Sequence, residues 1–225
     1  MKRFVLLALA TTAACGGSSG GGAVDRNRAG TGTSTLKVLA TATVTSSMTA
    51  PLTLLSVSVD NGQGQSVSNA AVTINNAGLG GDVTLTETPA GSGNYASSKT
   101  SLPTGDFTLN VVSGTDAVHG VVLGNPGAHT VNAPAANTTV TANQPLDVTW
   151  TTPSSAKAAT VTTRDLATIS VPDTGAYTIS AANNPPRASQ RVTIVRFNET
   201  DIAGALPGSL FSVTVTNQVT PYTVQ

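Results

Sequence analysis

The sequence predicts an all-β chain made of two tandem β-sandwiches. Thr, Val, Ser, Gly, Ala and Asn dominate the 225 residues, whereas Lys and Glu, which favour helices, are few. No segment keeps an apolar period of about 3.6 residues over three helical turns; apolar and polar residues instead alternate one by one, as in strands with one buried face. Gly, Asn and Pro separate these alternating runs at short intervals, which is typical of turns in sandwich folds.

The first residues have the composition of an export signal. Lys2 and Arg3 precede a short apolar run at residues 4–10, which is too short to cross a bilayer as a permanent helix. Small residues follow, and directly after them comes the only cysteine of the chain, Cys15. Residues 1–14 are therefore predicted to be a signal peptide that is removed on export.

Thr12-Ala13-Ala14-Cys15 resembles the lipobox of bacterial lipoproteins, in which small residues precede a cysteine that becomes the acylated N-terminus. The resemblance implies that Cys15 carries fatty acid such as palmitate. It also implies an anchor in the outer membrane, because Gly16 replaces the aspartate that retains some lipoproteins in the inner membrane. Residues 15–34 are Gly/Ser-rich and are predicted to form a flexible tether. The alternative is an ordinary secreted protein cleaved before a chance cysteine.

Composition narrows the function classes further. Acylation of Cys15 would leave no thiol for a disulfide, a redox couple or a metal-thiolate site. Loss of Lys2 and Arg3 with the signal would leave a weakly acidic protein, which offers no electrostatic footprint for nucleic acid. We expect contact with a membrane through the N-terminal lipid, and a protein or glycan partner at the cell surface. The protein would face either the periplasm or the exterior.

The first sandwich is predicted over residues 35–128. In its second apolar run the phase changes near Leu55, between residues 52–54 and residues 57–59, which predicts a β-bulge. The expected inward-facing residues are Leu36, Val38, Ala40, Ala42 and Val44; Leu52, Leu54, Val57 and Val59; Ala70, Val72 and Ile74; Val83 and Leu85; Phe107, Leu109 and Val111; and Val121 and Leu123.

A domain boundary is predicted where Pro126 to Pro134 interrupt the alternation with Asn-Pro-Gly and Ala-Pro steps. The second sandwich is then expected over residues 129–225. Its inward-facing residues are expected to be Leu146, Val148 and Trp150; Ile169 and Val171; Tyr177 and Ile179; Val192 and Ile194; and Phe211, Val213 and Val215.

Four motifs follow one another in the first half: Val57-Ser58-Val59-Asp60-Asn61-Gly62, Val67 to Ile74, Gly93-Asn94-Tyr95 and Leu102 to Leu109. Together they resemble carboxypeptidase-regulatory-like and related bacterial immunoglobulin-like modules, over residues 52–113. The resemblance implies a fold and a surface location and no reaction, because such modules serve as spacers, adhesive units and appended domains.

Asp173-Thr174-Gly175-Ala176-Tyr177-Thr178-Ile179 resembles the D-x-G-x-Y-x-C corner of immunoglobulin domains, with Ile179 in the place of the cysteine. The resemblance implies that Asp173 and Gly175 shape a turn, and that Tyr177 packs inward with its hydroxyl tied to nearby backbone. Leu146 to Thr151, with Trp150, resembles the tryptophan-bearing strand of fibronectin type III modules. The two resemblances agree on an immunoglobulin-like sandwich and leave its family open.

The sequence predicts no enzyme, cofactor or metal. Gly16 to Gly20 matches the G-x-S-x-G nucleophile motif, but it lies in the tether, without the strand and helix that a nucleophile elbow needs. His119 and His129 are the only histidines and are expected to be ordinary strand and loop residues. Without partner cysteines they cannot form a closed zinc site. The turn at Asn61-Gly62 forms without calcium.

The predicted function is that of a non-enzymatic, lipid-anchored cell-envelope protein acting as a structural or adhesive module. The alternative is a glycan-binding accessory module of a surface polysaccharide system. Sugars are usually held on exposed aromatic rings, and the residues expected inside are Tyr95, Phe107, Trp150, Tyr177 and Phe211. Phe197 and Tyr222 are the surface candidates. An enzyme would need a cleft that brings a histidine to a carboxylate and a hydroxyl.

Overall fold

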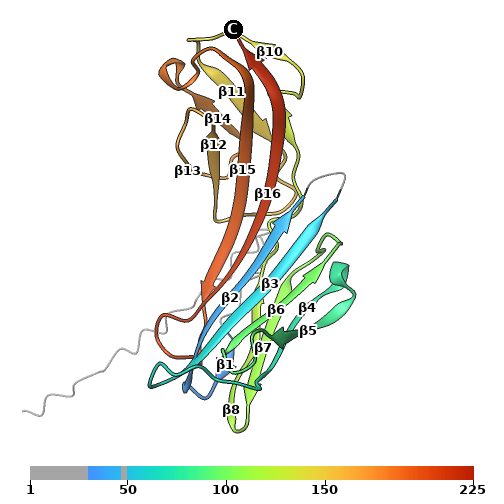
Figure 1. Cartoon of the computed structure of the whole chain (residues 1–225), viewed down its shortest axis with the longest axis vertical. Coiled ribbons are helices and arrows are strands. Elements are labelled where there is room, and N and C mark those ends of the chain that lie inside the picture. The colour runs from blue at the N-terminus through green and yellow to red at the C-terminus, as the bar shows by residue number, and fades with distance from the viewer. Residues whose placement is uncertain (1–29, 47–49) are drawn as a thin grey trace, which may run out of the picture.

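The computed structural model describes residues 30–46 and 50–225, and the regular secondary structure of this part of the chain is almost entirely β-strand (Figure 1). Cys15, the predicted signal peptide and the predicted tether up to residue 29 lie outside the described residues. No helix in the described ranges is long and apolar enough to cross a membrane. In chain order, the elements are β1 (Thr31–Gly32), β2 (Leu36–Thr45), β3 (Leu52–Asn61), β4 (Ala71–Asn76), the 3-10 helix η1 (Ala77–Leu79), β5 (Gly81–Glu87), β6 (Asn94–Lys99), β7 (Phe107–Ser113), β8 (Asp116–Leu123), β9 (Val131–Ala133), β10 (Thr139–Val140), β11 (Leu146–Trp150), β12 (Ala158–Thr163), β13 (Ile169–Val171), β14 (Ala176–Ile179), the 3-10 helix η2 (Ala181–Asn183), β15 (Arg187–Asp201) and β16 (Leu210–Val224).

The strands form two sandwiches, one above the other, that share one continuous sheet (Figure 1). This sheet runs in the order β1-β8-β7-β4-β5-β6-β3-β2-β16-β15-β12-β13, and a separate sheet runs β14-β11-β9. β5 pairs first with β4 and then, through Thr86 and Glu87, with β6, so it turns the corner between the two layers of the first sandwich. In the second sandwich β12, β13 and part of β15 and β16 face the three-stranded sheet. The all-β fold of two sandwiches is as the sequence predicts.

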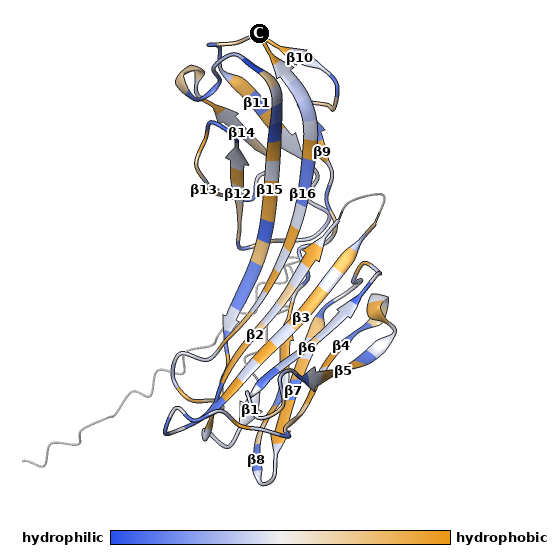
Figure 2. Cartoon of the chain, in the orientation of Figure 1, coloured by the Kyte–Doolittle hydropathy of each residue, from blue (hydrophilic) through white to orange (hydrophobic). Residues whose placement is uncertain are grey.

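Each sandwich has its own apolar core. The core in the first sandwich includes Val38, Val57, Val72, Ile74, Tyr95, Phe107, Leu109, Val111 and Leu123. The core in the second includes Val131, Val148, Trp150, Val161, Ile179, Val192, Ile194 and Tyr222. Apolar and polar residues alternate along the second half of β3 in Figure 2, because Leu55, Val57 and Val59 on one face are buried and the residues between them are not. Burial of these aliphatic and aromatic side chains supplies the main stabilisation of both sandwiches.

The predicted β-bulge near Leu55 is wrong. β3 pairs with β2 in unbroken register, and Leu55 and Val57 are buried on the same face as Thr53. The prediction failed because Thr53 occupies a core position, where its hydroxyl donates a hydrogen bond to the Ser101 carbonyl at 2.8 Å. Leu52 and Leu54, expected inside, instead lie on the outer face of β3, at 37% and 46% exposure.

The β15–β16 hairpin crosses from the second sandwich into the first (Figure 1). Each of its strands has 15 residues, a length of about 50 Å, and is longer than the other strands. Its far end places Ile202, Phe211 and Val213 in the core of the first sandwich. The predicted boundary assigned all of residues 129–225 to the second sandwich, and the structure differs there. Alternation shows which face of a strand is buried but does not show which core receives it.

The turn of this hairpin docks on the N-terminal strands of the first sandwich. The Ser34 N–H donates to the Gly204 carbonyl at 2.7 Å, and the Leu206 N–H donates to the Leu36 carbonyl at 2.7 Å. Gly32 lies so close to this turn that a Cβ atom on it would overlap the carbonyl oxygens of Gly204 and Ala117. The close approach therefore requires glycine at position 32.

We expect Gly32→Ala to lower the free energy of unfolding by about 2 kcal/mol, because the added methyl group can be fitted only by moving backbone. Gly62→Ala is the matched control, since a Cβ there meets only the Leu206 Cδ1 at 3.9 Å. Urea denaturation of both variants measures the difference. Equal stability of the two variants would contradict tight docking of the hairpin turn.

Candidate functional site

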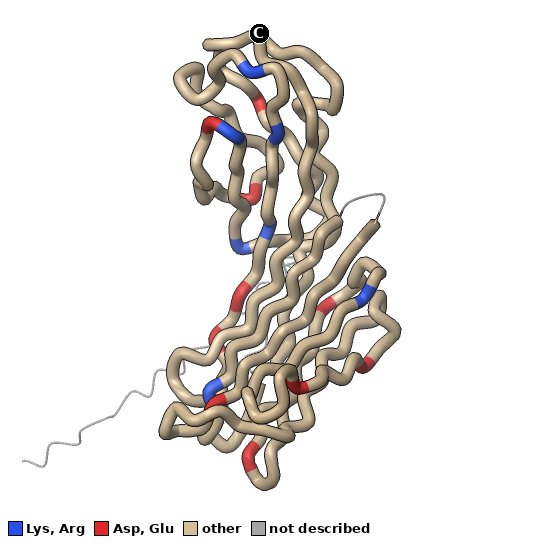
Figure 3. The backbone as a smooth tube through the Cα atoms, in the orientation of Figure 1, with Lys and Arg blue, Asp and Glu red and all other residues tan. Residues whose placement is uncertain are grey.

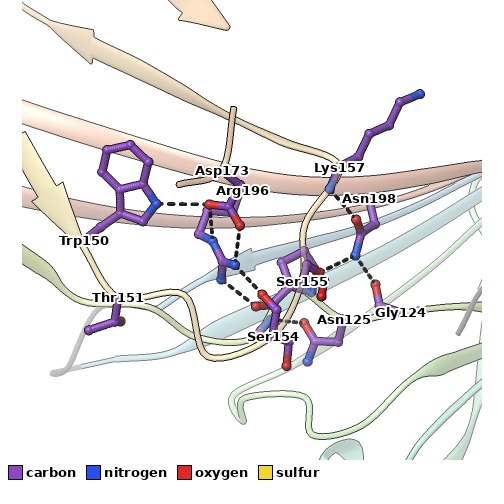
Figure 4. A network of polar contacts seen from close by, with 12 residues as sticks. Gly124, Asn125, Trp150, Thr151, Ser154, Ser155, Lys157, Asp173, Arg196 and Asn198 are labelled. Carbon is purple, nitrogen blue, oxygen red and sulfur yellow. Dashed lines mark hydrogen bonds and ion pairs between the residues drawn. The ribbon is translucent and has the colours of Figure 1, made fainter. Parts of the chain in front are cut away.

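The immunoglobulin and fibronectin resemblances single out four residues with a predicted structural role, which are Trp150, Asp173, Gly175 and Tyr177. Three of them meet in the second sandwich. Trp150 ends β11, and Asp173 and Gly175 lie in the turn between β13 and β14. The Trp150 indole Nε1 donates a hydrogen bond to Asp173 Oδ1 at 3.1 Å (Figure 4). The Trp150 N–H donates to the Gly175 carbonyl at 2.8 Å, and Gly175 has a φ of 84°, which favours glycine. The turn thus holds the Asp173 carboxylate against the indole.

Arg196, which the sequence analysis missed, is the centre of this cluster. It lies on β15, is 0% exposed, and forms an ion pair with Asp173. One edge of its guanidinium binds both carboxylate oxygens: Nε donates to Oδ1 at 2.8 Å and Nη2 to Oδ2 at 2.6 Å. Two backbone carbonyls accept the remaining bonds, that of Pro126 from Nη1 at 2.5 Å and that of Ser154 from Nη2 (Figure 4). A fully buried cation is therefore matched by four acceptor contacts.

The charge state of this pair follows from its surroundings. Burial raises the pKa of Asp173, but the hydrogen bonds from Arg196 and Trp150 and the positive charge of Arg196 outweigh burial, so the carboxyl pKa lies below its ordinary value. Charged side chains are sparse along the described part of the chain (Figure 3) and make up 10% of the full sequence. Removal of either partner alone would leave an uncompensated buried charge.

Asn198 extends the network toward the first sandwich. It follows Arg196 on the inward face of β15 and is buried. Its Nδ2 donates to the Gly124 carbonyl at 2.8 Å and to the Ser155 carbonyl at 3.1 Å, and its Oδ1 accepts from the Lys157 N–H at 2.7 Å (Figure 4). Gly124 begins the linker between β8 and β9. Arg196 and Asn198 therefore tie this linker, at Gly124 and Pro126, to the hairpin that crosses between the sandwiches.

His129 lies in the same linker and is 2% exposed. Burial, and then the positive charge of Arg196, lower the pKa of His129 to about 4; the Ile194 carbonyl and Asp173 act in the opposite direction. Neither ring nitrogen makes a hydrogen bond of good geometry within the described chain. The His129 carbonyl accepts a bond from Asn217 Nδ2 at 2.5 Å, so β16 also holds the linker. His129 is thus a neutral packing residue at neutral pH, close to a buried cation.

Tyr177, the fourth predicted structural residue, lies on β14 opposite Val148 and is half-buried against the second core. The contacts that the immunoglobulin resemblance implies for its hydroxyl are made in the first sandwich by Tyr95. The Tyr95 hydroxyl donates to the Val67 carbonyl at 2.7 Å and accepts from the Ala70 N–H at 2.9 Å. Tyr95 is the last residue of the Gly93-Asn94-Tyr95 motif, and this motif is the sequence signal that could have identified its role.

The structure leaves fewer aromatic residues at the surface than the glycan-binding alternative needs. Tyr222, expected at the surface, is 1% exposed and belongs to the second core, so that prediction is wrong. The prediction failed because a shift in register between β15 and β16 near Gln190 turns Tyr222 inward. Phe197 is half-buried on β15.

The candidate catalytic groups do not come together. His119 is exposed on β8, where it pairs with Thr31 of β1, and His129 is buried in the linker. Within residues 30–46 and 50–225, no group of three His, Cys, Asp or Glu side chains could hold a metal ion. A cavity of about 350 Å³ beside Asp173 is lined by Thr152, Ser154, Ser155 and Ala156. The Asp173 carboxylate already accepts hydrogen bonds from Arg196 and Trp150.

Comparison with known proteins gives remote likenesses. No protein-family model matches the sequence, and no curated protein matches it at a significant level. The fibronectin(III)-like modules of Clostridium thermocellum CbhA align with 80% of this chain and 92% of theirs, at 16% identity and a TM-score of 0.28. The adhesin InvE of Yersinia pseudotuberculosis aligns with 83% of this chain at 16% identity and a TM-score of 0.29, and the aligned part is 60% of the adhesin chain. The fold described above rests on the strands and cores of this chain.

Proposed function

We propose that the protein is a non-enzymatic spacer of the bacterial cell envelope, anchored to the outer membrane through lipid on Cys15, with two sandwiches that act as one structural or adhesive unit. The observation that carries the proposal is the β15–β16 hairpin, because β16 contributes to both cores, while β15 contributes to the second core and the residue after it, Ile202, to the first. Sandwiches joined only by a linker would move relative to each other, which is the usual behaviour of domains in one chain. A hairpin that runs from the second sandwich into the first opposes such motion.

The buried polar network supports the same proposal. Arg196 and Asn198 hold the linker carbonyls of Pro126 and Gly124, and Asn217 holds that of His129. The linker between β8 and β9 also connects the two sandwiches, and these bonds join it to the hairpin. A spacer or adhesive unit gains from such bracing, because a partner bound to the second sandwich would then be held at a constant distance from the first sandwich. The partner would be a protein or a glycan at the cell surface, reached from the periplasmic or the external face.

The anchor is tested by Cys15→Ser in a bacterium that processes lipoproteins. We expect the wild-type protein to incorporate labelled palmitate and to sediment with outer membranes. The variant should lose the label and move to the soluble fraction, because the hydrophobic contribution of the acyl chains is gone. Ser18→Ala in the predicted tether is the control and should behave as wild type. Equal fractionation of wild type and Cys15→Ser would exclude the lipid anchor.

A further inference from the structure

The first long strand and the last strand of the chain lie side by side and run in the same direction. β2 and β16 form a parallel ladder of seven residue pairs, from Leu39 opposite Leu210 to Thr45 opposite Thr216. Both strands run upward in Figure 1, and β16 continues to the end of the molecule that carries the C-terminus. The N-terminal side of β2 and the C-terminal side of β16 therefore lie at opposite ends of the ladder.

This arrangement determines how the ladder responds to tension. If one force pulls β2 back toward its N-terminal side and another pulls β16 toward its C-terminal side, the two strands must slide along each other. All hydrogen bonds of the ladder are then strained together and must break together. If both forces act at the same end of the ladder, the strands separate one pair at a time, and each bond breaks alone. The first geometry resists a much larger force, because forced unfolding depends on the barrier that must be crossed in one step.

Both ends of the ladder carry further bonds. At the lower end the Val38 N–H donates to Ser209 Oγ at 3.0 Å, and the Ser209 hydroxyl donates to the Leu206 carbonyl at 2.7 Å. At the upper end the backbone N–H and the hydroxyl of Ser46 both donate to the Thr216 carbonyl, at 2.9 and 3.0 Å. These bonds add to the ladder bonds that must break before β2 and β16 can slide along each other. Both ends of the ladder are therefore reinforced against shear.

We propose that the β2–β16 ladder is a load-bearing clamp, which lets the protein carry tension between the N-terminal side of the first sandwich and the far end of the second. The load passes directly from β2 to β16. It bypasses the linker that contains Pro126 and His129, since β16 itself runs through both sandwiches. The clamp is a property of the fold and goes beyond the spacer role, because a spacer need not carry force. It does not depend on acylation of Cys15.

Single-molecule force spectroscopy tests the clamp by comparing two pulling directions in the same full chain with Cys15→Ser. In the shearing direction, handles are attached at Thr35→Cys and Gln225→Cys, both exposed, on either side of the ladder. In the peeling direction, the second handle is moved to Pro207→Cys, exposed in the hairpin turn beside the start of β2. At one loading rate, we expect the mean rupture force to be several-fold higher in the shearing direction. Equal forces, or a lower shearing force, would overturn the proposal.

A pair of serine variants separates the clamp from general stability. Ser209→Ala removes the hydroxyl that accepts from Val38 at the lower end, directly before β16, whereas Ser212→Ala removes a hydroxyl from the outer face of β16. We expect the shearing force to fall for Ser209→Ala and to stay at the wild-type value for Ser212→Ala. A shearing force that Ser209→Ala leaves unchanged would also contradict the clamp. Because all variants lack Cys15, failure here leaves the palmitate experiment unaffected.

Discussion

Arg196→Met is expected to lower the free energy of unfolding by about 4 kcal/mol, since removing one partner of a buried ion pair leaves the other charge uncompensated. Asp173, with a side chain 5% exposed, would keep only the hydrogen bond from Trp150. The carbonyls of Pro126 and Ser154 would lose their donor as well. Denaturation by urea at neutral pH, with the slope checked against wild type, measures the loss.

Two comparisons make this expectation specific. Arg187 and Asp165 form a similar ion pair, but the Arg187 side chain is 39% exposed, so Arg187→Met should cost about 1 kcal/mol or less. The double variant Arg196→Met with Asp173→Leu should recover much of the loss, because no buried charge then remains. A cost for Arg196→Met no greater than that for Arg187→Met would show that the buried network does not hold the junction.

Acidification is expected to destabilise the protein through His129 by about 3 kcal/mol between neutral pH and pH 4, if the full lowering of its pKa from 6.5 to about 4 is realised. The unfolded chain binds a proton on this histidine below pH 6.5, whereas the folded chain resists it until about pH 4. The stability that depends on neutral His129 is therefore complete above pH 6.5 and is lost progressively as the pH falls toward 4. The lowered pKa of Asp173 acts at still lower pH, where the carboxylate would be protonated.

His129→Gln isolates this effect, because glutamine is polar and does not titrate. Unfolding free energies measured from pH 7 to pH 4.5 should fall more steeply for wild type than for His129→Gln. His119→Gln, at an exposed position on β8, is the matched control and should keep the wild-type profile. Parallel profiles for wild type and His129→Gln would mean that the fold accepts the proton on His129 without cost.

The positions of the strands were predicted from the sequence more accurately than the core against which each strand packs. The five residues expected inward on β2, from Leu36 to Val44, are all buried, because strict alternation leaves one choice of face. At β3 the greater hydrophobicity of Leu52 and Leu54 suggested the wrong face, since a threonine with a bonded hydroxyl can replace an aliphatic residue in a core. The path of the hairpin into the first sandwich could not be predicted, because alternation shows which face of a strand is buried but not which core receives that face.

The polar network was only half visible in the sequence. Asp173, Gly175 and Trp150 were identified through local motifs, but Arg196 was not, although it is in phase with Val192 and Ile194 on the inward face of β15. A charged residue at an inward position predicts a buried partner. That partner lies 23 residues away in sequence, and two further contacts are backbone carbonyls without a sequence signal.

The hairpin and the buried network are expected to hold the two sandwiches as one rigid body. Spin labels at Ala96→Cys on β6 and Ser170→Cys on β13, both exposed and in opposite sandwiches, report on it directly in a Cys15→Ser background. Pulsed electron spin resonance should give one narrow distance distribution, no wider than that of two labels within the first sandwich. A broad or multiple distribution would show that the sandwiches move independently and would contradict the claim.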